Sequence, residues 1–521
     1  VTYYQILVLA ISVAVAIGLR YLFTRTRIGL TMRAVVDDRD LTARAGASPY
    51  RTAQLSWALG ASLAALAGIL IAPLQQLGQL NLTFLVVVGF SAAVVGRLKS
   101  LPLTVAGAMA LGIAQSYAVG YLPVTLLSNL NPVIPTILLF FAVLFLRQDR
   151  LAVARPVALP KRRTMTLGPS VVLGGSFVVI AVLMTGVLGP GNLIIFNQGI
   201  VLGIVMLSLV LVAGYGGQVS LCQMTLGGVG AYAMGRTLGG GSLLGLVAAV
   251  LVPAAVAFVL ALTVVRLRGL YLALATLAFA EGMDNMFFNR ELGYGGELHV
   301  GRFLAQSDKG FVIESAVIFA ALAVGVLAVK RSQFGRRLAA LNDSEAACAS
   351  IGMSIRWTKV AVFTAAGGIA GLGGALYGGA QHVVSPGDFQ FLISLTLLLT
   401  ITLGGIDTVA GAFAAAMFYS LTPVIQKHAT FVPSGLRDNL TFVLVGLGAI
   451  SLGRNPGGII GQLNQAGDIL RDLRRRLSQP TPSPARASAY RSGGPSLIDL
   501  DGPVYPLDPD RSPAEDSLVV R

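Results

Sequence analysis

Long hydrophobic runs are the feature that most limits what this chain can fold into. A helix needs roughly 20 apolar residues to cross the hydrocarbon core of a bilayer, where each backbone N–H and C=O must find a partner within the protein. Many such runs fit into the 521 residues, of which 55% are hydrophobic and 12% charged. We therefore predict an all-α, polytopic membrane protein with about 14–15 membrane segments. The candidate segments are 4–23, 52–74, 82–96, 103–121, 131–147, 169–189, 193–213, 217–237, 242–265, 269–288, 311–329, 358–380, 390–404, 408–424 and 438–453.

The basic residues are concentrated in a few segments between the hydrophobic runs. The formal net charge is +15, which in a soluble protein would suggest a nucleic-acid partner. Here Lys and Arg lie mainly in 24–51, 147–163 and 330–359 and in the cluster 474–476, as is typical of cytoplasmic loops. We expect all four segments on the cytoplasmic side, membrane lipid around the helices, and no nucleic acid as a partner.

The chain contains an internal repeat. A shift of 306 residues aligns 27–70 with 333–376 without a gap, and 11 of the 44 positions are identical. The basic loops of the two copies are expected on the same side of the membrane, so we predict a parallel repeat about an axis along the membrane normal. Two homologous helical bundles are therefore expected in one chain.

The repeat and the changes in composition predict four domains. The first half is 1–147, which we expect to be truncated at its N-terminus because fewer spans precede the linker than follow it. A basic, proline-containing linker occupies 148–165, and the second half is 166–453. The polar tail at 454–521 is rich in Pro, Ser, Arg and Asp and is expected to be cytoplasmic and disordered.

A short polar loop at equivalent places in the two halves carries helix start and stop signals. In the stretch LNDSEAACASIGMS (341–354), Asp343 is expected to cap a short helix and Gly352 to end it, and Asp37 to Gly46 repeats this design in the first half. A helix this short is marginal in water and needs a packing partner, so two readings stay open: a capped surface turn, or a docking point present in both halves. The loop residues are Asp37, Asp38, Asp40 and Gly46 in the first copy, and Asp343, Glu345, Ala346, Ala347 and Gly352 in the second.

Four stretches carry a resemblance to a known family. The triplet Glu345-Ala346-Ala347, followed after four residues by Gly352, resembles the coupling-loop signature of ABC importer permeases. GYGGQVSLCQMTLGGVGAYA (214–233) and LRGLYLALATLAFAEG (267–282) resemble the second membrane protein of branched-chain amino acid importers, and 24–110 resembles the later part of the first. The resemblance implies that both membrane subunits are fused in this chain.

The same resemblance implies partners and a location. Two cytoplasmic ATP-binding subunits would seat on the coupling loops, and an extracytoplasmic substrate-binding protein would deliver the substrate. ATP and magnesium are expected in the partner subunits, with no cofactor and no metal bound by this chain. The expected location is the bacterial plasma membrane, and the expected cargo is branched-chain or related amino acids.

The glycine-rich run 217–237 is expected to be broken or re-entrant, which is tolerated only where protein covers it. By resemblance it lies near the translocation pathway, where bare backbone and amide or hydroxyl groups would meet an amino acid. Tight helix packing through small residues is the competing interpretation. The pathway candidates are Gly214, Gly216, Gly217, Gln218, Ser220, Gln223, Gly227, Tyr271 and Thr276; Glu281 and Asp284 are expected at a span end, in reach of water.

Other functional classes find less support. The chain has no GxxxxGK[ST] phosphate loop and no HExxH motif, so we expect no enzyme and no ATP site of that kind. An ion-coupled secondary transporter would carry paired ionisable groups inside the spans, and the sequence has almost none. An ABC importer of urea, short amides or sugars stays open as an alternative.

Overall fold

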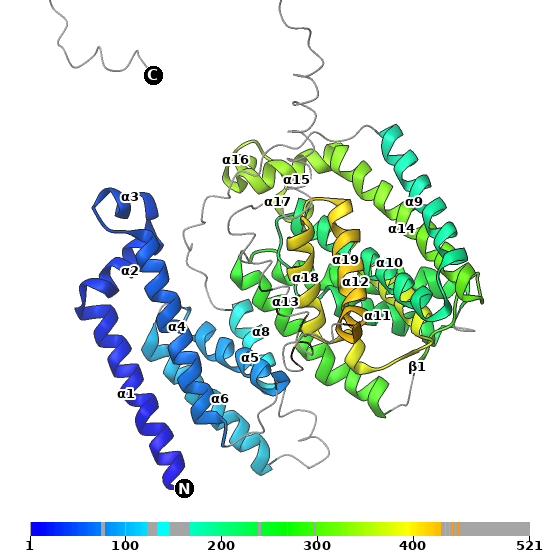
Figure 1. Ribbon diagram of the computed structural model, residues 1–521. Helices are drawn as coiled ribbons and strands as arrows, with labels where there is room; N and C mark the ends of the chain where they lie inside the picture. The colour runs from blue at the N-terminus through cyan, green and yellow to red at the C-terminus, as the bar shows by residue number, and fades with distance from the viewer. Residues whose placement is uncertain are drawn as a thin grey trace, which may run out of the picture. The chain divides into compact units, whose positions relative to one another are not determined.

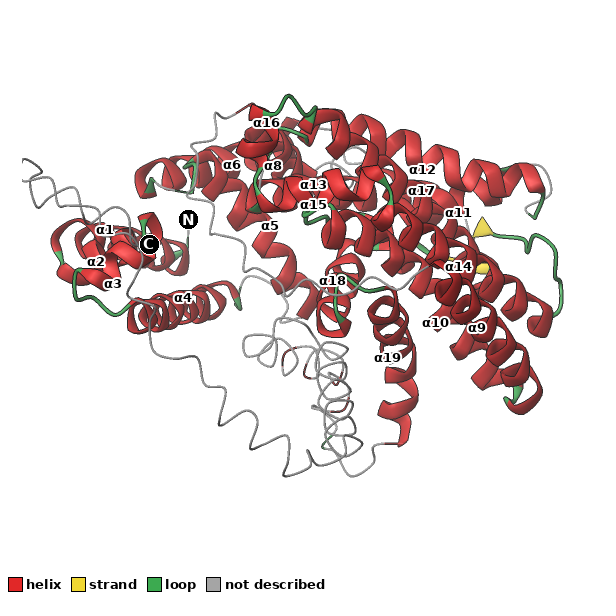
Figure 2. Cartoon of the chain, turned by 90° about the horizontal axis from the view of Figure 1, so that it is seen from above, coloured by secondary structure: helices red, strands yellow, loops and turns green. Residues whose placement is uncertain are grey.

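Helices make up nearly all of the structure, as expected for a chain that must satisfy its backbone within a bilayer. The computed structural model describes residues 2–73, 79–98, 100–121, 133–145, 167–237, 241–267, 269–294 and 298–428, with five single positions between 433 and 446. The predicted linker 148–165, nearly all of the run 438–453 and the tail 454–521 lie outside the described residues. Within these residues, Figures 1 and 2 show the helices and a short pair of strands.

The first half contributes seven helices to the described part. The helix α5 packs against both α6 and α8, while α2 contacts α1 and α4. The apolar faces of α1 and α4 are almost bare, because Thr52 is the single buried residue on these two helices. The helices are α1 (Tyr3–Arg25), α2 (Arg27–Asp37), α3 (Arg39–Arg44), α4 (Pro49–Ile71), α5 (Gln79–Val95), α6 (Leu101–Tyr121) and α8 (Ile134–Phe145).

The second half contains the main hydrophobic core. Its central helix, α17, packs against α10, α11 and α12, and α10 also contacts α14 and α19. Its elements are α9 (Leu167–Val187), α10 (Pro190–Leu209), η2 (Val210–Tyr215), α11 (Gln223–Arg236), α12 (Leu243–Val264), α13 (Leu270–Met283), η3 (Asp284–Tyr294), β1 (Leu298–His299), α14 (Asp308–Arg331), α15 (Gln333–Asp343), α16 (Glu345–Ser350), α17 (Ile355–Gln381), β2 (Val383–Val384), η4 (Pro386–Phe389), α18 (Phe391–Gly404) and α19 (Val409–His428). Strands β1 and β2 pair antiparallel, with Leu298 opposite Val384.

Every predicted hydrophobic run other than 438–453 overlaps a helix of the described part. Eight of these helices are long and apolar enough to cross a membrane, and four shorter apolar helices accompany them. The eight are α1, α4, α6, α10 with η2, α12, α14, α17 and α19. The chain is a multi-pass membrane protein.

The run at 217–237 is broken, as the sequence predicts. The helix α10 continues as the π-helix η2, the backbone is irregular at 216–222, and α11 then begins at Gln223. With 14 residues, α11 is too short to cross a bilayer alone. Its side chains are nearly all buried by surrounding helices, which is the condition under which broken backbone is tolerated at membrane depth.

Glycines allow α17 to approach α11 and α12 at backbone distance. A Cβ at Gly374 would overlap the backbone carbonyl of Gly227, and one at Gly371 would overlap Pro253 on α12. Close packing of this kind is how helices associate in lipid, where apolar side chains gain little from leaving the bilayer. The small-residue stripe through Gly227 is thus a helix contact in this structure.

Candidate functional site

The two copies of the repeat fold into the same helical design. The helices α2 and α15 begin and end at positions separated by 306 residues, and so do α3 and α16. The helices that follow, α4 and α17, begin at Pro49 and Ile355, again 306 apart. The structure therefore bears out the alignment found in the sequence, down to the helix boundaries.

The caps of the two short helices lie one residue later than predicted. The side chain of Asp38 accepts a hydrogen bond from the backbone N–H of Leu41 at 2.8 Å, and Ser344 Oγ accepts one from Ala347 at 3.2 Å. The predicted caps, Asp37 and Asp343, are instead the last residues of α2 and α15. The cap requires the extended backbone of an N-cap residue, which Asp38 and Ser344 adopt and the helical residues before them do not.

Both short helices end at a glycine, as predicted. Gly46 has φ +86° and Gly352 has φ +77°, which is the left-handed conformation that glycine adopts without steric cost. The backbone N–H of Met353 donates to the carbonyl of Cys348 at 3.0 Å, and Ala47 makes the equivalent bond to Thr42 at 3.2 Å. These bonds satisfy carbonyls that the helix end would leave unpaired.

Each short helix buries one residue and exposes the others, except that Glu345 on α16 is half-buried. Cys348 on α16 and Thr42 on α3 point inward. On α16, Ala346 and Ala347 are exposed, and Ile351 just after it is 78% exposed. On α3, Leu41 is 66% exposed. The outward faces thus combine small side chains with a large exposed apolar one, which suits the close approach of another protein.

An ion pair holds α16 to α17 in the second half alone. Lys359 Nζ on α17 pairs with Glu345 Oε1 in the first turn of α16, and both side chains are largely shielded from water. The equivalent positions in the first half are Arg39 and Ala53, which cannot form an ion pair. The two loops therefore share a backbone design but differ in how firmly side chains fix the short helix.

The loop of the second half touches the broken segment at 216–222. Gln218 Nε2 donates to the backbone carbonyl of Lys359 at 3.4 Å. Gly217, with φ +61°, lies so close to the side chain of Asn342 on α15 that a Cβ would overlap it. We call these contacts, together with the Lys359–Glu345 ion pair, the coupling junction. It connects the short helix to the irregular backbone through the first turns of α17.

The polar pathway candidates are buried and hydrogen-bonded within the protein. Ser208 Oγ donates to Gln223 Oε1 at 3.1 Å, and Gln223 Nε2 donates to Ser220 Oγ at 3.3 Å. Thr276 Oγ1 accepts from the backbone N–H of Leu221 at 3.0 Å and so ties α13 to the broken segment. These bonds fix the shape of the segment, and contact of these groups with a substrate stays a prediction.

The other pathway candidates are also in close contact with protein. Gly214 lies against the backbone of Ile406, and Gly216 against Val362. Tyr271 donates from its hydroxyl to the backbone carbonyl of Arg97 at 3.1 Å, which joins α13 to the first half. The broken segment is thus braced by α15 and α17, and the end of η2 just before it is braced by the turn before α19.

Comparison with known proteins places this chain in a family. The family described as "Branched-chain amino acid transport system / permease component" matches residues 1–144 and 192–446, which is more than half of the chain and includes both copies of the repeat. The chain belongs to this permease family. The match confirms the family that the coupling-loop motif and the two longer strings predict.

Several curated permeases are similar to parts of the chain. LivM, a high-affinity branched-chain amino acid transport permease of Escherichia coli K12, is 29% identical over 255 residues, covering 43% of this chain and 59% of LivM. BraD of Pseudomonas aeruginosa is 32% identical over 120 residues, covering 22% of this chain and 38% of BraD. LivH of E. coli K12 is 33% identical over 112 residues, covering 21% and 34%. The chain thus spans less than two thirds of each relative, and no solved structure matches it.

Two acidic residues of this permease are more deeply buried than expected. Glu281 and Asp284 are 5% and 7% exposed, so the expectation that they reach water is wrong. Asp284 accepts from the backbone N–H of Phe391 at 2.9 Å and so helps to start α18, while Glu281 accepts from Asn285 Nδ2 at 2.9 Å. Helices that are distant in the sequence cover these two side chains. The hydrophobicity pattern along the sequence does not indicate which helices pack together, so it could not predict this burial.

Two members of the coupling junction were also missed from the sequence. Asn342 lies within the stretch 341–354 and Lys359 lies shortly after it, but neither belongs to a motif. Lys359 lies at the start of the hydrophobic run 358–380, where a lysine is ordinarily interpreted as a charge that flanks a membrane span. Ser344 was detectable, because the 306-residue shift pairs it with Asp38, and both are residue types favoured at an N-cap.

Proposed function

We propose that this chain is the membrane-spanning permease of an ATP-binding-cassette importer that moves branched-chain or related amino acids into a bacterial cell. Its membership in the permease family and the names of its relatives support the class of cargo. The observation that carries the mechanism is the coupling junction, because it joins an outward-facing short helix to the broken segment of the core.

Two cytoplasmic ATP-binding subunits, which bind ATP and magnesium, would dock on α3 and α16. The exposed alanines of α16 and the bare apolar side chains of Leu41 and Ile351 suit such docking. The basic residues around both loops support a cytoplasmic location. An extracytoplasmic binding protein would deliver the amino acid at the opposite face and contribute most of the specificity.

Movement would pass through the junction in three steps. Closure of the ATP-binding subunits displaces α16, and the Lys359–Glu345 ion pair transfers the displacement to the first turn of α17. Because Gln218 is bonded to the backbone of Lys359 and Gly217 rests on Asn342, the segment 216–222 moves with it. Irregular backbone lacks a regular hydrogen-bond ladder and rearranges at lower cost than a helix, which makes this segment the natural moving part.

Co-expression with candidate ATP-binding subunits tests the docking sites. Glu345→Lys repels Lys359 and Gly352→Pro prevents the left-handed turn, so both variants should weaken co-purification of an ATP-binding subunit. Lys309→Glu, at the opposite end of α14, serves as a control for a charge reversal remote from the loop. A complex that survives both loop variants unchanged would show that the docking site lies elsewhere.

Uptake of labelled substrate tests the cargo and the energy source. Cells or vesicles that contain the assembled importer should accumulate labelled leucine, and depletion of ATP should stop uptake while the membrane potential remains intact. Uptake that continues without ATP would contradict the ATP-driven mechanism. Transport of urea or a sugar without any transport of leucine would contradict the class of cargo while leaving the docking result untouched.

A further inference from the structure

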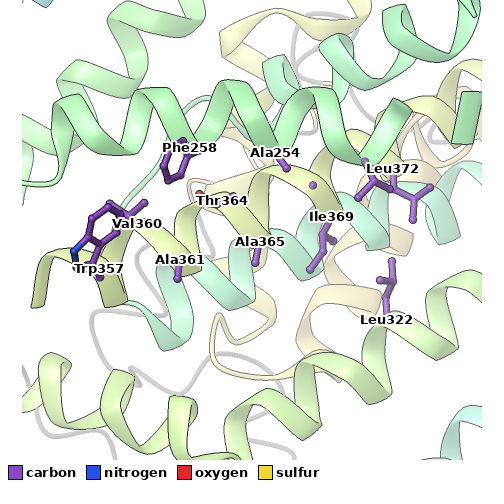
Figure 3. A pocket seen from close by; sticks show the side chains of 12 residues that line it. Ala254, Phe258, Leu322, Trp357, Val360, Ala361, Thr364, Ala365, Ile369 and Leu372 are labelled. Carbon is purple, nitrogen blue, oxygen red and sulfur yellow. The ribbon is translucent and has the colours of Figure 1, made fainter. Parts of the chain in front are cut away.

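An apolar groove runs along α17 between α12 and α14. Its volume is about 510 Å³, within the range typical of ligand sites. Figure 3 shows Phe258 of α12 beside Trp357 at one end, and Leu322 of α14 near Leu372 at the other. The small side chains of Ala361 and Ala365 form its floor and are exposed in the structure.

The groove opens toward the surface that faces lipid. Leu251, the residue after the lining residue Val250 on α12, is 61% exposed, and Ala361 and Ala365 of α17 are exposed within the groove itself. These side chains lie on helices long and apolar enough to span a bilayer. A groove of this size lined almost wholly by carbon would not stay empty in a membrane, because unfilled apolar space forfeits packing energy. Acyl chains surround it and match its chemistry.

One end of the groove carries the features of a membrane interface. Trp357 is 56% exposed, and tryptophan is enriched where hydrocarbon meets the headgroups. The guanidinium carbon of Arg356 lies 5.9 Å from the centre of the Trp357 ring. Both residues are in the first turn of α17, next to the basic loop assigned to the cytoplasmic side. A guanidinium there is suited to a lipid phosphate.

We propose that this groove is a binding site for an anionic phospholipid of the cytoplasmic leaflet. One acyl chain lies along Ala361 and Ala365, Trp357 marks the interface, and Arg356 contacts the phosphate. Charge selects this occupant, because the cytoplasmic leaflet is anionic and the guanidinium of Arg356 lies beside Trp357 at this end of the groove. The bound lipid packs on the same turns of α17 that carry Lys359, so it would steady the helix to which α16 is paired. The site does not depend on which substrate is transported.

Tryptophan fluorescence offers a direct test, because the chain has two tryptophans, Trp57 and Trp357. The full chain with Trp57→Phe is placed in nanodiscs of phosphatidylcholine that contain increasing amounts of phosphatidylglycerol with brominated acyl chains. Quenching of Trp357 should saturate at a low fraction of the brominated lipid. Brominated phosphatidylcholine should quench it without such saturation. The reverse variant, Trp357→Phe, leaves Trp57 on the bare face of α4, where no preference between the two lipids is expected.

Variants with matched controls locate the site. Ala365→Phe fills the groove and should lower the affinity for phosphatidylglycerol about tenfold, the loss expected for roughly two buried methylenes. Val252→Phe adds the same bulk on the exposed face of α12 and should have no effect. Arg356→Gln should reduce the preference for phosphatidylglycerol over phosphatidylcholine about fivefold, whereas Arg337→Gln on α15 should leave it unchanged.

Native mass spectrometry of the purified chain gives a second measurement. It counts the lipids bound to the folded protein, so it can be used even if a variant is less stable than the wild type. Wild-type protein should retain one phosphatidylglycerol that Ala365→Phe loses. Equal retention by Ala365→Phe and Val252→Phe would overturn the site, and equal affinity for the two lipids would overturn the role of charge. A protein partner that Ala365→Phe releases, with no lipid retained by the wild type, would show that a membrane helix fills the groove instead.

Discussion

At the scale of the residue, backbone conformation and not lack of space requires glycine at the two loop positions. A Cβ at Gly46 or Gly352 would meet no atom within 4 Å, so space does not limit these positions. Their positive φ does, because an L-residue in the left-handed region costs roughly 1–2 kcal/mol. The two positions therefore isolate a conformational cost from a packing cost.

We expect Gly352→Ala and Gly46→Ala each to lower the free energy of unfolding by about 1 kcal/mol. Thermal unfolding in detergent or nanodiscs measures the change. Gly325→Ala is the matched control, since it also has open space around it but lies inside α14, where alanine is the better helix former. A loss of stability for Gly325→Ala equal to that for Gly352→Ala would contradict the conformational explanation.

The Lys359–Glu345 ion pair gives a second prediction at this scale. Lys359→Met removes a charged partner from a shielded carboxylate, and we expect it to loosen α16 by about 2 kcal/mol. Hydrogen exchange of the backbone amides of 346–352 should rise accordingly. The double variant Glu345→Lys with Lys359→Glu restores the pair with its charges reversed and should recover part of the protection. If exchange in this loop is the same in wild type and Lys359→Met, the ion pair does not hold α16.

At the scale of the element, equivalent helices of the two halves have different surroundings. In the most apolar 18-residue window of α17, 72% of the residues are buried, whereas none are buried in the corresponding window of α4. Positions 61, 65 and 68 of α4 and its C-cap, Ala72, are all small residues, as are the equivalent positions 367, 371, 374 and 378 of α17. The same pattern of small residues is thus in close contact with other helices in the second half and exposed in the first half.

A paired substitution measures that difference. A Cβ at Gly374 would overlap the backbone of Gly227, which cannot move aside without shifting α11, whereas a Cβ at Gly68 meets nothing within 4 Å. We expect Gly374→Ala to cost about 3 kcal/mol or more and Gly68→Ala to be neutral or slightly stabilising. Size-exclusion profiles and thermal unfolding of the two variants provide the comparison. Equal tolerance at both positions would mean that α11 and α17 are not in backbone contact.

At the scale of the whole molecule, the repeat predicts that α3 and α16 face the same side of the membrane. The chain has two cysteines, both buried, so alanine at Cys222 and Cys348 provides a background for single introduced cysteines. Ala43→Cys and Ala349→Cys lie at equivalent exposed positions on α3 and α16. Both should react with a membrane-impermeant maleimide from the cytoplasmic side. Labelling of the two cysteines from opposite sides would contradict the parallel repeat.

Sequence alone determined the features that depend on local chemistry. Runs of apolar residues located the helices, the 306-residue shift located the repeat, and Gly46 and Gly352 ended the short helices where predicted. The coupling-loop motif and the longer strings identified the permease family. These inferences succeed because hydrophobic length and backbone conformation at glycine are properties of a few neighbouring residues. The N-caps are equally local, and the sequence prediction placed them one residue too early, at Asp37 and Asp343 instead of Asp38 and Ser344.

Only the tertiary structure decided which residues meet. It buried Glu281 and Asp284, which the sequence places near water. It also joined Lys359 to Glu345 and Gln218 to the backbone of α17, and it opened the groove beside Trp357. The physical reason is that burial and partnership depend on how helices far apart in the chain pack, and small residues such as Gly227 and Gly374 permit that packing without specifying it in the local pattern.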